Sequence, residues 1–347
     1  MLRFLGRDVT EAFTFGLNSL FGFYYVQAPD HVPSCHLGCA LPSSSELAFA
    51  HEGFDAVRVE ASDREEAWEV AKNAVDEGRP LMVQLDPSLL PRYPLPPGTR
   101  KPHHRVLVVG YGSGGGAGGG GGGANDCSVL VLDPALPEPA EFPLEAFLDA
   151  RGADAPWSPP KLAWWDVRPA GEPSNTTYSL RRAVSLTARW YLRDDTGFRG
   201  VEALRRFAAD LEGWLDLEEL PPHELAADSA LQGALPANVR FTNARQYQCF
   251  AVAWQLREES GGNGAYRPTF LKFVQEVLAA LPDQSLVEET LPLLREATHA
   301  WRDLQATLLE LAGEDAKSFE RSTDRLRELV DQVIGLETSA VNLLSRL

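Results

Sequence analysis

The pattern of hydrophobic residues changes near residue 170, and this change limits the folds open to the chain. Before residue 170, short apolar runs are separated by Pro and Gly, which is typical of strands. After it, apolar residues recur three and four positions apart over long stretches, which is typical of helices. The sequence therefore predicts an α+β first part over residues 1–168 and an all-helical second part over residues 178–347.

The first part is expected to combine several strands with one early helix. The helix covers residues 63–77, with Ser62 as its N-cap and Glu65 at the third helical position. Residues 156–173 are rich in Pro and Trp and show no period, so we predict a linker or an inter-domain strap there. The expected strands cover residues 56–60, 80–85, 104–111 and 128–132.

The second part is expected to be a helical bundle. Its last two helices are long, and Gly313 between them favours an antiparallel turn. Apolar residues at helical spacing in this region indicate bundle core and not a cofactor site. The expected helices cover residues 179–192, 200–214, 245–259, 268–281, 285–311 and 316–347.

Charge and cysteine content exclude several classes of protein. The 347 residues contain 32 Lys and Arg against 49 Asp and Glu, a formal charge of −17, which disfavours binding to nucleic acid or to an anionic membrane. Four cysteines are too few for a disulfide-stapled secreted protein of this length. No signal peptide or membrane span is recognisable. We therefore expect a cytoplasmic protein that binds neither nucleic acid nor membrane.

One histidine and one aspartate are predicted to meet. His104 begins the strand 104–111, where alternation places it on the same face as Val106 and Val108. The next strand, 128–132, ends immediately before Asp133. If the two strands pair antiparallel, the Asp133 carboxylate can reach the imidazole of His104. A carboxylate that orients a histidine base is the arrangement found beside an activated nucleophile.

The glycine-rich stretch 112–123 joins these two strands. A phosphate-binding loop needs a few glycines at fixed offsets that lead into a helix, whereas this stretch leads into a strand. We predict a hairpin loop that binds no ligand.

Several motifs together resemble a known family. They are the early stretch 11–23 (EAFTFGLNSLFGF), the GRP triplet 78–80 before VQLD, and the His104 and Asp133 motifs. In this order they resemble the N-terminal domain of the butirosin biosynthesis protein H family, a papain-like cysteine acyltransferase domain. Residues 203–211 and 261–267 resemble the helical domain of unknown function that often follows it.

The resemblance implies a fold and an activity. The fold would be a papain-like cysteine-enzyme domain with a mixed or antiparallel sheet, followed by the helical domain. The activity would be transfer of an acyl group from an acyl-carrier-protein thioester to a small-molecule amine, with no cofactor and no metal. Carried over, His104 is the general base and Asp133 its orienter. The resemblance says nothing of the oligomeric state.

The family's nucleophilic cysteine has no counterpart at the matching position. In the family this cysteine lies upstream of the Gly-rich early stretch, whereas this chain starts at Met1-Leu2-Arg3. The first segment of the domain is therefore expected to be missing, or the nucleophile has been lost, or Cys35 or Cys39 replaces it.

Other interpretations of the same residues remain open. The chain is either an acyltransferase, a catalytically silent binding or scaffold protein, or, as a third choice, a cysteine peptidase-like amide hydrolase. A zinc site made by His31, Cys35, His36 and Cys39 is a weaker alternative, because the spacing lacks two well-formed pairs.

Two further features lie near His104 in the sequence. The basic run Arg92, Arg100, Lys101, His103, His104 and Arg105 suits an acidic carrier protein, or it only solvates a Pro-rich loop. Asp86-Pro87 is a possible second carboxylate near the site or an ordinary turn.

Overall fold

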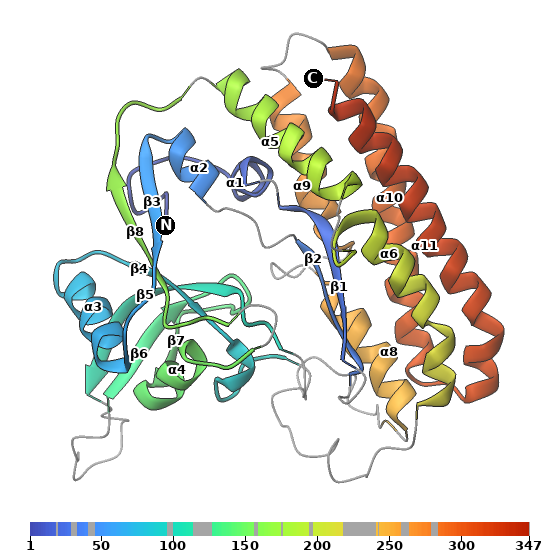
Figure 1. Cartoon of the computed structure of the whole chain (residues 1–347), viewed down its shortest axis with the longest axis horizontal. Helices are drawn as coiled ribbons and strands as arrows, with labels where there is room; N and C mark the ends of the chain where they lie inside the picture. The colour runs from blue at the N-terminus through green and yellow to red at the C-terminus, as the bar shows by residue number, and fades with distance from the viewer. Residues whose placement is uncertain are drawn as a thin grey trace. The chain divides into compact units, whose positions relative to one another are not determined.

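A computed structural model of the chain shows two compact units (Figure 1). Met1–Asp8 and Phe54–Gly171 form unit 1, while Val9–Gly53 and the described residues from Glu172 onward form unit 2. The structure describes residues 1–18, 20–28, 33–40, 46–95, 100–113, 127–155, 159–174, 176–193, 197–217, 241, 243–257, 264–278 and 284–346.

Unit 1 is built on a six-stranded sheet in which all neighbouring strands are antiparallel. The strand order is β3-β8-β4-β5-β6-β7. Its centre is apolar because alternate residues such as Val83, Val106 and Val131 are at most 2% exposed. The elements are β3 Phe54–Val59, α3 Arg64–Asp76, β4 Leu81–Leu85, η1 Pro87–Leu89, β5 His104–Ser113, β6 Cys127–Leu132, β7 Ala140–Pro143, α4 Leu144–Arg151 and β8 Trp164–Pro169.

The four strands expected in this part are confirmed, whereas the linker expected at 156–173 is wrong. That stretch contains β8, which pairs with β3 along its length and with β4 at Trp164. Neighbouring residues Trp164 and Trp165 are both buried. Because burial does not alternate at this point, the sequence shows no period of two.

Helix α3 is confirmed, but it begins one residue later than predicted. Asp63, not Ser62, is the N-cap, and its side chain accepts a hydrogen bond from the backbone N–H of Glu66. Glu66 in turn accepts from the backbone N–H of Ser62 at 2.7 Å. The predicted cap is therefore shifted by one position, since Asp and Ser are both good caps, and Glu66 reaches back to the residue before the N-cap.

Unit 2 packs a two-stranded antiparallel ribbon, β1 Phe21–Gln27 and β2 Cys35–Ala40, against helices. The sequence does not predict this ribbon. β1 contacts α5 and α6, and β2 contacts α8. The long helices α10 and α11 lie side by side, as expected for an antiparallel pair (Figure 1). The helices are α1 Glu11–Leu17, α2 Glu46–His51, α5 Thr176–Leu192, α6 Gly200–Asp210, η2 Glu212–Asp216, α8 Ala244–Gln255, α9 Arg267–Leu278, α10 Gln284–Leu311 and α11 Ala316–Leu344.

Early and late segments approach closely at Gly16 of α1. A Cβ atom at this position would lie 2.1 Å from ring atoms of Phe273 in α9. Only glycine permits this helix contact, which explains one of the glycines in the early stretch.

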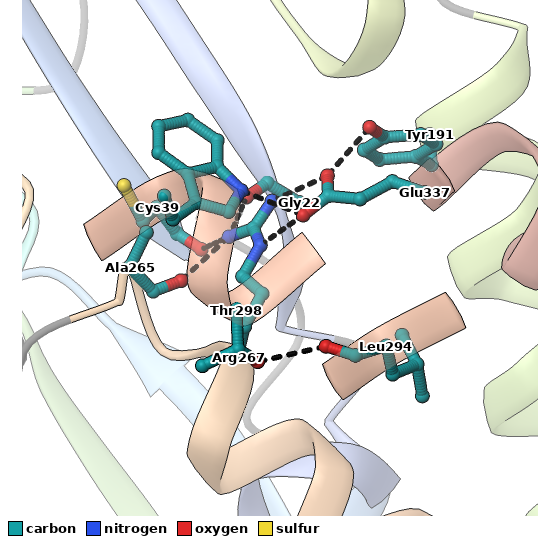
Figure 2. Close-up of polar contacts among 9 residues, drawn as sticks. Gly22, Cys39, Tyr191, Ala265, Arg267, Leu294, Thr298 and Glu337 are labelled. Atoms are coloured by element: carbon teal, nitrogen blue, oxygen red, sulfur yellow. Dashed lines mark hydrogen bonds and ion pairs between the residues drawn. The ribbon is translucent and has the colours of Figure 1, made fainter. Parts of the chain in front are cut away.

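A buried ion pair joins the ribbon to the helices (Figure 2). Arg267 and Glu337 are fully buried, and Arg267 Nη2 donates to Glu337 Oε2 at 2.8 Å. Arg267 Nη1 also donates to the backbone carbonyls of Gly22 in β1 and Cys39 in β2, at 2.9 and 3.0 Å. Glu337 accepts further hydrogen bonds from Tyr191 and Trp301. These partners satisfy a charge pair that would otherwise be costly to bury.

The two units do not follow the domain boundaries predicted at residues 168 and 178. Residues 9–53 pack with the helices, although they precede most of the sheet in the sequence. The two units are defined by packing, whereas the predicted domains are defined by family, so the domain boundaries stay a prediction.

Two further expectations from the sequence concern the β5–β6 hairpin and membrane-spanning helices. β5 and β6 pair as the hairpin predicted, but the glycine-rich connection at 114–126 lies outside the described residues. Among the helices that the structure describes, none has the length and apolarity needed to cross a bilayer.

Candidate functional site

His104 and Asp133 meet as the sequence predicts. His104 is the first residue of β5, and Asp133 directly follows β6, which pairs antiparallel with β5 through Leu107 and Leu132. His104 Nε2 lies 2.7 Å from Asp133 Oδ2. The predicted adjacency is confirmed, and the part that these residues play in a reaction is a proposal.

The pair is buried, and the carboxylate is well supplied with hydrogen-bond donors. The side chains of His104 and Asp133 are 7% and 0% exposed. Burial by itself raises the pKa of Asp133, but the charge of His104 and hydrogen bonds from His104, Tyr93 and the backbone N–H of Ala135 outweigh it. The pKa of Asp133 is therefore below its usual value, and the residue is a permanent carboxylate near neutral pH.

Tyr93 is a third member of the site, and the sequence reasoning missed it. Its hydroxyl donates to Asp133 Oδ2 at 2.5 Å and lies 3.1 Å from His104 Nε2. Tyr93 is 6% exposed. It lies in an irregular segment after η1, where neither periodicity nor a motif signals its position.

The arrangement fixes which ring nitrogen of His104 can act as a base. Asp133 is ionised, so His104 Nε2 carries the proton that it donates to Asp133. In the neutral imidazole the basic lone pair then lies on Nδ1. A substrate N–H or S–H group would have to approach the Nδ1 edge of the ring.

The basic run is divided between structural and exposed residues. Arg100 forms an ion pair with the fully buried Asp86, which also accepts hydrogen bonds from Ser88 and from the backbone N–H of Lys101. Arg105 packs its guanidinium 4.6 Å from the centre of the Trp165 ring. Arg92 is exposed. Asp86 therefore anchors a loop and is not presented to a substrate.

The candidate cysteine nucleophiles belong to the other unit. Cys35 and Cys39 lie on β2 in unit 2 and are at most 2% exposed, whereas His104 and Asp133 belong to unit 1. Burial raises the pKa of Cys35 to about 12, although hydrogen bonds from Gln248 and Tyr25 act in the opposite direction. A thiol with such a pKa carries almost no thiolate at neutral pH and is a poor nucleophile.

Cys127 is the cysteine that the structure describes within unit 1. It pairs with Ser113 at the end of the β5–β6 hairpin opposite His104. The nine residue steps from His104 to Ser113 span about 30 Å of extended strand. Cys127 cannot exchange a proton with His104 at that distance.

The alternative zinc site is not assembled in the part of the chain that the structure describes. Cys35 and Cys39 are four residues apart on β2 and share a face, whereas His36 points to the other face. His31 lies outside the described residues. Among the described residues, no three His, Cys, Asp or Glu side chains are grouped as metal ligands would be.

Comparison with known proteins finds a similarity in the first third of the chain. A family model described as butirosin biosynthesis protein H, N-terminal, matches residues 1–117. No curated protein matches the chain. The matched segment contains Tyr93 and His104, ends before Asp133, and contributes residues to both structural units.

Proposed function

We propose that this chain transfers an acyl group from a thioester to an amine, as an acyltransferase-like biosynthesis protein would; the match of residues 1–117 to the butirosin biosynthesis protein H N-terminal model supports the proposal. One observation carries the proposal. The buried His104–Asp133 pair, at 2.7 Å, is a base with its orienting carboxylate. The papain-like fold implied by the family is part of the same proposal.

His104 is the proton carrier in this reaction. Its Nδ1 atom takes the proton of the attacking amine as the new C–N bond forms. The C–S bond of the thioester then breaks, and the departing thiolate receives that proton from the imidazolium. Asp133 stabilises the imidazolium between these two steps because it is a carboxylate at Nε2.

A covalent version of the reaction requires a cysteine. A thiolate would first take the acyl group from the donor, and the amine would then remove it, with His104 serving both steps. Cys39 and Cys35 are the candidates, and their burial in unit 2 favours the direct reaction over the covalent one.

The proposed acyl donor is carried by an acyl-carrier protein, and the acceptor is a small-molecule amine. Support for the carrier protein comes from Arg92, which is exposed on the loop that also presents Tyr93. Carrier proteins are acidic, so a basic residue beside the site would assist their docking. We place the activity in the cytoplasm.

The experiment is product analysis with a small acyl thioester and a panel of primary amines. We expect an amide product that His104→Ala abolishes and Asp133→Asn reduces by about 10²–10⁴-fold, because the base and its orienter contribute on that scale. Glu141→Gln, an exposed residue of β7, is the matched control and should leave the rate unchanged. Formation of the free acid in place of the amide would support the amide hydrolase alternative.

Intact-mass spectrometry separates the two routes. The direct reaction predicts no acyl adduct on the chain, whereas a stoichiometric adduct on Cys35 or Cys39 would establish the covalent route.

A silent binding or scaffold protein is the second candidate. It is favoured by the position of Cys127, since among the described residues of unit 1 this cysteine lies at the wrong end of the hairpin to work with His104. Binding of a thioester without any amide, acid or adduct would support this candidate.

A further inference from the structure

Asp133 Oδ2 is shared by two side chains. It accepts a hydrogen bond from the Tyr93 hydroxyl at 2.5 Å and one from His104 Nε2 at 2.7 Å. The other carboxylate oxygen, Oδ1, accepts from the backbone N–H of Ala135 at 2.9 Å. Each donor that binds a carboxylate stabilises its negative charge and reduces the attraction that it exerts on the remaining donors.

Tyr93 is held in this position by a loop that is fixed at both ends. Asp86, at the end of β4, accepts hydrogen bonds from Ser88 on one side of Tyr93 and from Lys101 on the other. Its ion pair with Arg100 strengthens the second attachment. The backbone at Arg92, directly before Tyr93, has a φ angle of +61°.

Such a backbone conformation is unfavourable for a residue other than glycine and persists only where surrounding contacts enforce it. Here it turns the chain so that the next side chain, Tyr93, reaches Asp133. The Tyr93 ring also packs edge-on against the His104 ring, with centroids 6.1 Å apart. Two independent contacts therefore locate Tyr93 against the pair.

We propose that Tyr93 is a positioning residue that tunes the His104–Asp133 pair by sharing Asp133 Oδ2. It holds the Asp133 carboxylate in the orientation in which Oδ2 accepts the hydrogen bond from His104 Nε2. It also limits how strongly the carboxylate stabilises the imidazolium, so that His104 can release its proton to a leaving group. The inference rests on the proposed function for its purpose, but its electrostatic effect can be measured without any substrate.

Other charged groups lie near His104 along the chain. Asp86 follows the β4 residue that pairs with His104 and is neutralised by Arg100. Lys101 and His103 precede β5, and Arg105 packs against Trp165. The Tyr93 hydroxyl itself touches the pair, at Asp133 Oδ2 and, 3.1 Å away, at His104 Nε2, so its removal acts on His104 through these two contacts.

The test follows the ring signals of His104 by NMR in protein labelled at histidine. His104→Gln identifies the signals, and the ring nitrogen shifts report the tautomer. In Tyr93→Phe we expect the titration midpoint of His104 to move to higher pH, because Asp133 Oδ2 then interacts with the imidazolium without a competing donor. Tyr111→Phe is the matched control, since the Tyr111 hydroxyl donates to the exposed Asp76 and should not affect His104.

A second variant keeps the hydroxyl and changes only its acidity. A fluorotyrosine placed at position 93 is a stronger donor to Asp133, so we expect the midpoint of His104 to move to lower pH. Opposite shifts in the two variants cannot arise from a general loosening of the loop. An unchanged midpoint in both variants, or shifts of the same sign, would overturn the proposal.

Activity gives an independent readout of the same residue. If the amide-forming reaction is observed, Tyr93→Phe should move the acid limb of its pH–rate profile in the same direction as the NMR midpoint. If the wild-type chain forms no amide, the proposed function fails, whereas the NMR result still decides whether Tyr93 tunes His104.

Discussion

Asp133 connects the chemistry of the site to the stability of unit 1. Its pKa is lower in the folded chain than in the unfolded chain, because His104, Tyr93 and Ala135 hold it as a carboxylate against the effect of burial. The stabilisation is therefore complete above the unfolded pKa, about 4, and is lost as the pH falls through the lower folded value.

Asp133→Asn should remove this pH dependence. At pH 7 we expect a loss of about 1.5–3 kcal/mol in the free energy of unfolding, the value of hydrogen bonds to a charged group. As the pH falls, the wild-type and variant curves should converge. Melting temperatures between pH 7 and pH 3 test this, with Glu141→Gln as control. Parallel curves for wild type and variant would contradict it.

Arg92 offers a test of the proposed carrier protein. Arg92→Glu reverses one exposed charge beside the site, so we expect kcat/KM for a donor bound to carrier protein to fall about tenfold. The rate with a small soluble thioester should stay unchanged, because Arg92 does not touch the His104–Asp133 pair. Equal losses with both donors would instead indicate damage to the loop that holds Tyr93.

The contrast between Asp133 and Tyr93 shows what the sequence can predict at a site. His104 and Asp133 could be paired because adjacent strands of a hairpin place the start of one beside the end of the next. Tyr93 could not, because its position depends on a loop held by Asp86 and on an unusual φ angle at Arg92. Neither feature leaves a periodic signal.

At the level of single elements, the cap of α3 gives a direct stability test. Asp63→Ala should lower the free energy of unfolding by about 0.5–2 kcal/mol, because the backbone N–H of Glu66 loses its acceptor. Ser62→Ala should cost less, since the backbone N–H of Ser62 still binds Glu66. Urea unfolding of the two variants measures the difference. A larger loss for Ser62→Ala would restore the cap first predicted from the sequence.

Glu337 connects helix α11 to the ribbon through its ion pair with Arg267, and loss of this ion pair should lower the free energy of unfolding. Glu337→Gln leaves Arg267 as a buried, uncompensated charge, so we expect a loss of about 3–5 kcal/mol in the free energy of unfolding. Glu320→Gln, exposed on the same helix, is the control and should change it by less than about 0.5 kcal/mol. Denaturant titration measures both.

Removing both charges should not restore stability. In the double variant that combines Arg267→Met with Glu337→Gln, the backbone carbonyls of Gly22 and Cys39 lose their hydrogen-bond donor. Full recovery in the double variant would contradict a network that depends on all of these partners.

The helices were predictable one by one, but their attachment to the ribbon was not. Apolar spacing located α5, α10 and α11 because each helix carries its own period. The ion pair of Arg267 with Glu337 joins positions 70 residues apart. β1 and β2 were missed because their residues, such as Phe21 and Phe23, are buried without alternation.

At the scale of the whole molecule, the family segment and the packing units disagree, and this has a testable consequence. A fragment of residues 1–171 contains β1 and β2 but lacks the helices on which they pack. Burial of an aromatic side chain such as Phe21 contributes about 1.5–3 kcal/mol, which the fragment would lose.

Limited proteolysis should therefore separate two regions of this fragment. We expect rapid cleavage within β1 and β2 and resistance within the strands of the six-stranded sheet, which is complete in the fragment. In the full chain both regions should resist. Equal protection of β1 and β2 in the fragment would show that the ribbon folds without the helices.

The strand order of unit 1 also determines when each strand can find its neighbour during translation. β8 lies between β3 and β4, so the facing edges of these early strands have no neighbour until residue 169 has left the ribosome. The delay is longer for Gly22, because the hydrogen-bond donor to its carbonyl is Arg267, which is synthesised 245 residues later. Translation thus releases the first strands long before their partners exist, and the open edges of the nascent chain are exposed to pairing with other chains until β8 and α9 have emerged.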